Sequence, residues 1–155
     1  MRNKNLDFLE KAKDYAFLLL KFRLRSEKEI RERLRRKKFD VDTTRKTISF
    51  LKERGFVDDN IFAKTWLEFR IKRPLGLKRL RQELKIKGIN EDIIDTQIRE
   101  VKKNYSEDKV VRELAKEKFQ KFKGIESHKA KQRIFGYLMR RGFSLDTVID
   151  AVKEL

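Results

Sequence analysis

Three segments of the sequence share one pattern of apolar residues: Ile30-Arg-Glu-Arg-Leu-Arg-Arg-Lys-Lys-Phe39, Leu80-Arg-Gln-Glu-Leu-Lys-Ile-Lys-Gly-Ile89 and Ile134-Phe-Gly-Tyr-Leu-Met-Arg-Arg-Gly-Phe143. In each, the first apolar residue is followed by a second at +4 and a third at +9, across a short basic run. The segments recur about every fifty residues, and such a period predicts a tandem helical array.

The sequence around these segments predicts helices and no strand. It contains one proline and six glycines, and apolar residues recur in steps of three and four. Ser26 with Glu29 forms a capping box. The other expected helix starts are Asp42, Asp58 or Asp59, Asn90, Ser106, Ser127 and Ser144.

These signals predict an all-α fold of about nine helices. We expect an elongated tandem array of three three-helix repeats, with boundaries at residues 1–57, 58–105 and 106–155. A three-helix unit is small, so neighbouring repeats are expected to share a core.

The composition argues against catalysis. There is no cysteine, which excludes disulfides, thiol nucleophiles and Cys-ligated zinc, and a single histidine excludes multi-histidine metal sites. We interpret His128 as a solvated residue in a first helical turn, and Asp58 and Asp59 as capping acids. No glycine-rich phosphate loop or carboxylate cluster is recognisable. The sequence therefore predicts no enzyme, no metal and no cofactor.

The charge points to a polyanionic partner. The chain carries 42 Lys+Arg against 25 Asp+Glu, a net charge of +17, with the largest share of the excess in residues 1–57. Lys/Glu enrichment, as in thermophile proteins, accounts for the charged content but not for the positive excess. The longest apolar run, residues 15–20, is too short to span a bilayer, and no signal peptide is recognisable, so we expect a cytoplasmic protein.

The clearest candidate surface is the predicted helix over residues 77–87. On a helical projection, three leucines cluster on one side and Lys78, Arg79 and Lys85 point away, with Arg81 and Lys87 at the edges. Arg81 could equally be a core-edge residue. Arg70, Lys72 and Arg73 lie at the end of the preceding helix. Cations there could contact a polyanion or simply stabilise the helix dipole. The aromatic stripe Phe62, Trp66 and Phe69, like the other phenylalanines, is expected to be core rather than a base-stacking surface.

One long motif resembles the RecX family, bacterial regulatory proteins that act on the RecA recombinase. It runs from Phe50-Leu-Lys-Glu-Arg-Gly-Phe-Val-Asp-Asp-Asn-Ile-Phe-Ala63 through Arg70 to Gly76-Leu-Lys-Arg-Leu-Arg-Gln-Glu-Leu-Lys-Ile-Lys-Gly-Ile89. The segment from Lys131 to Phe143 is similar to the C-terminal repeat of that family, and the resemblance covers nearly the whole chain. Lys38 departs from it, since glycine often precedes the aromatic residue there.

The resemblance implies a role in DNA repair, homologous recombination and the SOS response. It implies binding in the groove of a RecA filament, bridging successive protomers, and inhibition of RecA's ATPase and strand exchange by capping filament growth or promoting disassembly. It also implies affinity for single- and double-stranded DNA. We expect this affinity to be electrostatic and independent of base sequence.

We expect contacts to the filament or to DNA from a set of basic residues: Arg70, Lys72, Arg73, Lys78, Arg79, Arg81, Lys85 and Lys87, with Arg31, Arg35, Arg36, Lys38, Arg140 and Arg141. A monomer is the expected state. The alternative is a general DNA-binding protein without a protein partner, with a helix-turn-helix among its helices. Binding to anionic membranes is a weaker alternative, since the apolar faces are needed for the core.

Overall fold

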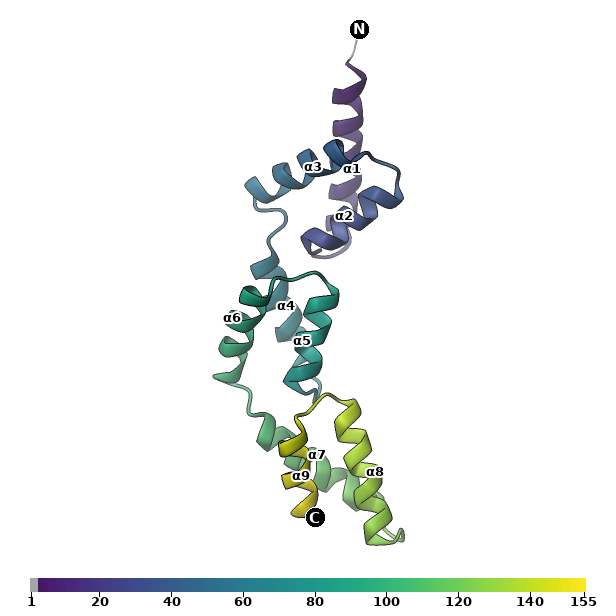
Figure 1. The fold of residues 1–155 in the computed structure, drawn as a ribbon, viewed down its shortest axis with the longest axis vertical. Helices are drawn as coiled ribbons and strands as arrows, with labels where there is room; N and C mark the ends of the chain where they lie inside the picture. Colours follow the sequence, from purple (N-terminus) through teal and green to yellow (C-terminus); the bar gives the residue numbers. More distant parts are fainter. Residues whose placement is uncertain (1–2) are drawn as a thin grey trace.

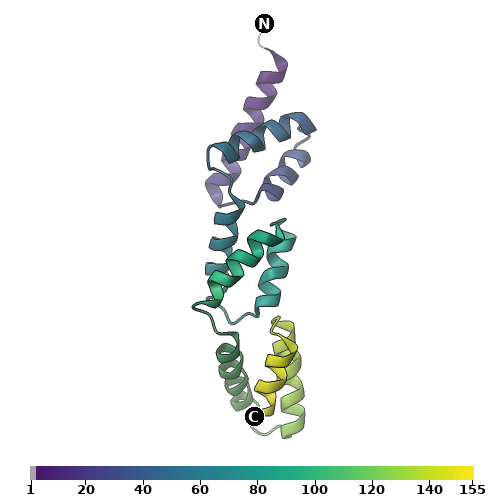
Figure 2. The same cartoon turned by 60° about the vertical axis from the view of Figure 1, so that its left-hand side comes forward.

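The computed structural model describes residues 3–155, and every regular element in that range is an α-helix. In chain order the helices are α1 (Lys4–Phe22), α2 (Glu27–Arg36), α3 (Val41–Glu53), α4 (Asp59–Arg70), α5 (Leu77–Ile86), α6 (Glu91–Lys102), α7 (Glu107–Lys121), α8 (Ser127–Arg140) and α9 (Leu145–Lys153). They form three groups of three along one long axis, and α1 and α9 lie toward opposite ends in both views (Figures 1 and 2). The predicted all-α tandem array is confirmed.

Each repeat buries an apolar core of its own. The three clusters of buried residues fall within residues 12–57, 62–98 and 111–151, and no buried residue belongs to two of them. The expectation that neighbouring repeats share a core is therefore wrong. Within each group, the three amphipathic helices turn their apolar faces toward one another, and little apolar surface is left for the next repeat.

Most helix starts lie where the sequence predicts them. The Ser26 hydroxyl accepts the Glu29 N–H, and the Glu29 carboxylate accepts the Ser26 N–H, each at 3.2 Å. Two predictions need correction. The cap of α3 is Asp40 and not Asp42, because Asp40 accepts the Thr43 N–H at 2.7 Å. Ser127 is the first residue of α8 rather than its cap.

The aromatic stripe on α4 is only partly core. Phe62 is buried and Trp66 packs against the core of its repeat, as predicted, whereas the side chain of Phe69 is 61% exposed. At 100° per residue, the buried Ala63 and Leu67 lie on one side of Phe62 around the helix, and Phe69 lies on the other side. The core face therefore points away from Phe69. The core prediction is also wrong for three further phenylalanines, which are exposed: Phe8, Phe22 and Phe56.

The middle helices of the repeats, α2, α5 and α8, meet end to end. Where α2 begins, the Ser26 hydroxyl donates to the carbonyl oxygen of Lys87, just past the end of α5, at 2.6 Å. Where α5 begins, the Gly76 N–H donates to the carbonyl oxygen of Arg141, just past the end of α8, at 2.9 Å. Carbonyls at a helix C-terminus lack partners within their own helix, so each repeat supplies donors to the next one. The positive N-terminal end of one helix dipole also faces the negative C-terminal end of the next, which favours the same contact.

The turn that follows each middle helix has a left-handed backbone. In the second and third repeats it is glycine, Gly88 (φ 78°) and Gly142 (φ 82°), and a Cβ atom there would overlap Lys28 or Arg79 of the preceding repeat. In the first repeat the same position is Lys38 (φ 68°), whose side chain is exposed. The departure at Lys38 therefore leaves the turn geometry unchanged.

The close approach of backbones at Gly76 makes this position sensitive to substitution. A Cβ atom on Gly76 would overlap the carbonyl group of Gly142, which cannot rotate aside as a side chain can. We expect Gly76→Ala to destabilise the protein by about 3 kcal/mol or more. Gly55→Ala is the control, because Gly55 has φ 74° but no heavy atom within 4 Å of a Cβ atom, and should cost about 1 kcal/mol. The measurement is urea unfolding followed by circular dichroism. A larger destabilisation by Gly55→Ala than by Gly76→Ala would contradict the close backbone contact at Gly76.

Candidate functional site

Several of the predicted contact residues are already paired with acidic side chains of the chain itself. Ion pairs with nitrogen–oxygen distances of 2.6–3.3 Å hold Arg31, Arg70, Arg79, Arg81, Lys85 and Lys87. Their positive charge is therefore partly offset before any partner arrives.

Arg70 fixes α4 to α5 through Glu83. Its Nε and Nη2 atoms donate to the two carboxylate oxygens of Glu83 at 2.9 and 2.8 Å, and Trp66 Nε1 donates to the same carboxylate at 3.0 Å. Both charged side chains are only 18% exposed. Burial alone would raise the pKa of Glu83, but hydrogen bonds from Arg70, Trp66 and Arg79 lower it. This geometry gives Arg70 a structural role inside its repeat.

Lys87 joins the second repeat to the first. Its Nζ atom lies 2.8 Å from a carboxylate oxygen of Glu29 and 5.0 Å from the centre of the Trp66 ring. Arg23 donates to both oxygens of the same carboxylate, at 3.0 and 3.1 Å. Burial opposes ionisation of Glu29, yet these hydrogen bonds lower its pKa to about 2. Lys87 is thus part of a junction between repeats.

Arg81 and Lys85 lie on another side of α5 and face the start of α6. Arg81 reaches Glu91 at 3.1 Å and Asp95 at 2.6 Å, and Lys85 reaches Glu91 at 2.7 Å. Arg81 is half-buried, and its guanidinium holds two carboxylates of its own repeat.

The remaining predicted cations have no acidic partner within 4 Å in residues 3–155. They are Arg35, Arg36, Lys38, Lys72, Arg73, Lys78, Arg140 and Arg141. Arg141 is held at the junction between the second and third repeats, where it donates to the carbonyl oxygen of Pro74 at 3.4 Å and lies over the Tyr137 ring. The others are exposed.

A groove of about 530 Å³ lies where α5 meets the turn between α8 and α9. Its lining comes from both repeats: Lys78, Arg79, Gln82, Glu83 and Ile86 with Met139, Gly142 and Phe143. The Arg79 guanidinium donates to the carbonyl oxygen of Arg140 at 3.4 Å, and Ile86 is 63% exposed. The groove combines a cationic rim with an exposed apolar side chain, which suits a protein surface or a polyanion.

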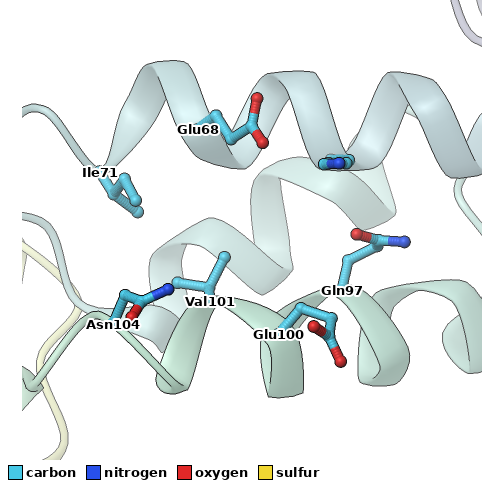
Figure 3. A pocket seen from close by; sticks show the side chains of 7 residues that line it. Glu68, Ile71, Gln97, Glu100, Val101 and Asn104 are labelled. Carbon is cyan, nitrogen blue, oxygen red and sulfur yellow. The ribbon is translucent and has the colours of Figure 1, made fainter.

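A second hollow, of about 380 Å³, lies between α4 and α6 (Figure 3). Glu68 of α4 and Ile71, the residue just after α4, line one side, and Gln97, Glu100 and Val101 line it from α6. Glu100 accepts hydrogen bonds from Lys103, which lower its pKa. A carboxylate that is exposed and readily ionised is not tuned as a general acid or base.

His128 and Asp58 lie as the sequence predicts, whereas Asp59, interpreted as a capping acid, does not cap α4. His128 is exposed in the first turn of α8, 3.1 Å from Gln132, and Asp58 caps α4. Within residues 3–155, no group of three or more His, Cys, Asp or Glu side chains could hold a metal ion. In the same residues, no helix is both long enough and apolar enough to cross a membrane.

Two acids lie at the junctions, in roles that the sequence does not predict. Asp59 accepts the N–H of Glu27 at 2.9 Å, and Glu107 occupies the matched place in the third repeat, accepting the N–H groups of Leu77 and Ser144. Burial raises the pKa of both carboxyl groups. Their matched positions, one residue after the caps Asp58 and Ser106, were the available signal.

Comparison with known proteins relates the chain to one family. Three family models, for the first, second and third three-helix domains of RecX, match residues 12–51, 58–96 and 106–152. "Regulatory protein RecX" of Amycolatopsis mediterranei is 33% identical, with 94% of this chain and 83% of the relative covered. The protein of that name in Chlorobium phaeobacteroides is 35% identical, covering 94% of each.

The fold is shared with a solved structure. The crystal structure of RecX from Lactobacillus salivarius matches with a TM-score of 0.83 over 97% of each chain, at 21% sequence identity.

The hydrogen bonds of Glu29 to Arg23 and Lys87 predict a specific loss of stability in acid. The pKa of Glu29 is about 2 in the folded protein against 4.5 ordinarily, so the unfolded chain binds the proton more readily. The stabilisation is complete above about pH 4.5 and is lost as the pH falls toward 2. Between pH 7 and pH 3 we expect the wild-type protein to lose about 2 kcal/mol more than Glu29→Gln. Urea unfolding at the two pH values measures this, and equal losses would contradict it.

Proposed function

Since the chain belongs to the RecX family of regulatory proteins, we propose that it is a non-enzymatic regulator of RecA filaments. In this proposal it binds in the groove of the filament and inhibits RecA's ATPase, strand exchange and filament growth. It acts as a monomer in the cytoplasm, in DNA repair, homologous recombination and the SOS response.

The observation that carries the proposal is the extended array with unpaired cations along it. The three repeats meet end to end, so the array extends along one long axis (Figures 1 and 2). Repeat arrays use extended surfaces to contact extended partners. A filament on DNA offers an extended polyanion, which complements the net charge of +17.

Within the array we assign the principal contact to the groove at the second and third repeats. Lys78 and Arg79 are exposed at its rim, and Arg140 is exposed beside it. Lys72, Arg73 and the basic residues of α2 supply further attraction. The paired side chains Arg70, Arg81 and Lys87 contribute mainly by holding the array in shape.

DNA affinity is a second part of the proposal. The exposed cations would neutralise phosphates without reading base edges, which makes the contact independent of sequence. Binding to single- and double-stranded DNA then brings the protein to the strand on which the filament forms.

Charge reversal across the groove tests the proposed contact. We expect Lys78→Glu with Arg140→Glu to raise the concentration needed for half inhibition of RecA's single-strand-dependent ATPase by roughly tenfold or more, because opposed charges become like charges. Lys109→Glu with Lys116→Glu is the matched control, since both lysines are exposed on α7 and neither has an acidic partner within 4 Å among the described residues. If Lys78→Glu with Arg140→Glu keeps its helicity and inhibits as the wild-type protein does, the groove is not the contact with the filament.

The same assay separates action on the filament from competition for DNA. Inhibition at substoichiometric protein that persists when RecA-free DNA is added supports direct action on the filament. Inhibition that needs saturated DNA and is relieved by added DNA would instead support the general DNA-binding alternative.

The salt dependence of binding reports the phosphate contacts directly. If about six phosphates are neutralised, the slope of log affinity against log salt on single strands should be near −4. Fluorescence anisotropy with a labelled oligonucleotide measures the slope. A slope near zero would show that DNA contact is not electrostatic.

A further inference from the structure

The turn between the middle and third helix differs among the repeats in a way that the shared fold does not require. In the second repeat, four side chains meet there: Arg81 and Lys85 from α5, and Glu91 and Asp95 from α6. The two cations and two carboxylates neutralise one another across the surface of the repeat. This arrangement serves as the internal reference for the other two repeats.

The first repeat keeps the cations and lacks the acids. The aligned apolar residues place Arg31 and Arg35 at the positions of Arg81 and Lys85, and Val41 and Arg45 at those of Glu91 and Asp95. In the third repeat all four matched positions are apolar: Phe135, Met139, Leu145 and Ile149. Only in the first repeat do the matched positions carry cations and no acid.

These residues surround a hollow of about 370 Å³, here named the repeat-1 hollow. Its lining is Arg31, Arg35, Phe39, Val41, Thr44 and Arg45. Val41 is 85% exposed, although it is apolar. The repeat-1 hollow therefore presents an uncovered apolar patch among three guanidinium groups.

The acids nearest to these guanidinium groups satisfy them in part. Arg31 pairs with Glu27 at 2.7 Å and Arg45 with Asp42 at 2.6 Å, while Arg35 has no acidic partner within 4 Å in residues 3–155. The side chains of Arg31 and Arg45 are 53% and 67% exposed, and ion pairs of exposed side chains contribute little. Each guanidinium has five N–H donors, so donors remain for a further carboxylate.

A buried hydroxyl group lining the repeat-1 hollow is a further difference between the first repeat and the other two. Thr44 is 7% exposed, and its Oγ1 atom has no hydrogen-bond partner among the described residues. The matched positions in the other repeats, Ile94 and Val148, are apolar and fully buried. An unpaired buried hydroxyl is costly, so the first repeat carries a polar group that its own packing does not use.

We propose that the repeat-1 hollow docks an acidic segment of a partner protein. Its carboxylates pair with Arg35, Arg31 and Arg45, as those of Glu91 and Asp95 pair within the second repeat, and an apolar side chain of the segment covers Val41 and Phe39. A phosphodiester strand supplies the charge, but its backbone carries no apolar side chain long enough to cover both Val41, which is 85% exposed, and Phe39, which favours the peptide. This inference does not depend on RecA being the partner.

The sharpest variant gives the first repeat the acids of the second. Val41→Glu with Arg45→Asp supplies Arg31 and Arg35 with internal carboxylates at the positions of Glu91 and Asp95, and should preserve folding. We expect it to bind a short labelled peptide of glutamate and leucine roughly tenfold or more weakly than the wild-type protein does. Fluorescence anisotropy gives the affinities, and circular dichroism checks the fold.

The control variant and peptides separate a specific site from general charge. Lys109→Glu with Lys116→Gln changes the net charge by the same amount on α7. This control should lower the affinity for the peptide far less than Val41→Glu with Arg45→Asp does. Replacing glutamate by glutamine, or leucine by serine, in the peptide should weaken binding to the wild-type protein. The Val41 methyl resonances should shift on addition of the glutamate–leucine peptide.

Three results would overturn the proposal. One is absence of binding of the glutamate–leucine peptide to the wild-type protein. A second is equal affinity for the Val41→Glu, Arg45→Asp variant. The third is a shift of the Val41 methyl resonances by an oligonucleotide but not by the peptide, which would assign the repeat-1 hollow to nucleic acid.

Discussion

The end-to-end contact between the middle helices is the constraint on which the rest of the structure depends. Each repeat closes a core of its own, so apolar burial does not set how one repeat sits on the next. That task falls to directional hydrogen bonds, from Ser26 to the Lys87 carbonyl and from Gly76 to the Arg141 carbonyl. Because these bonds join helix ends, the array extends along one direction and presents its side chains along a line.

Carboxylates at a junction and inside a repeat decide how much of the positive charge faces outward. Glu29 gathers Arg23 and Lys87, and Glu83 gathers Arg70 and Arg79. A carboxylate placed among cations offsets their charge and also ties helices together. The net charge of +17 therefore overstates the charge available to a partner, and the exposed cations without acidic partners are the relevant ones.

The three repeats share buried positions and differ on their surfaces. At one matched turn the second repeat carries ion pairs, the third apolar side chains, and the first arginines around an exposed valine. Buried residues must fit their neighbours, so the core limits change, whereas a surface turn tolerates any residue that does not disturb packing. A repeat fold can thus carry different binding surfaces on equivalent turns.

The sequence alone determined the helices, most of their caps and the repeat period, because these depend on residues a few positions apart, as in the Ser26–Glu29 capping box. It also identified the basic residues by type. Only the tertiary structure decided which cations are paired, because Lys87 and Glu29 lie 58 positions apart and meet only across a junction. The tertiary structure also decided that Phe69 is exposed and that each repeat has a separate core. Local hydrogen bonds and periodicity act within a helix, whereas ion pairs between repeats depend on where whole helices lie.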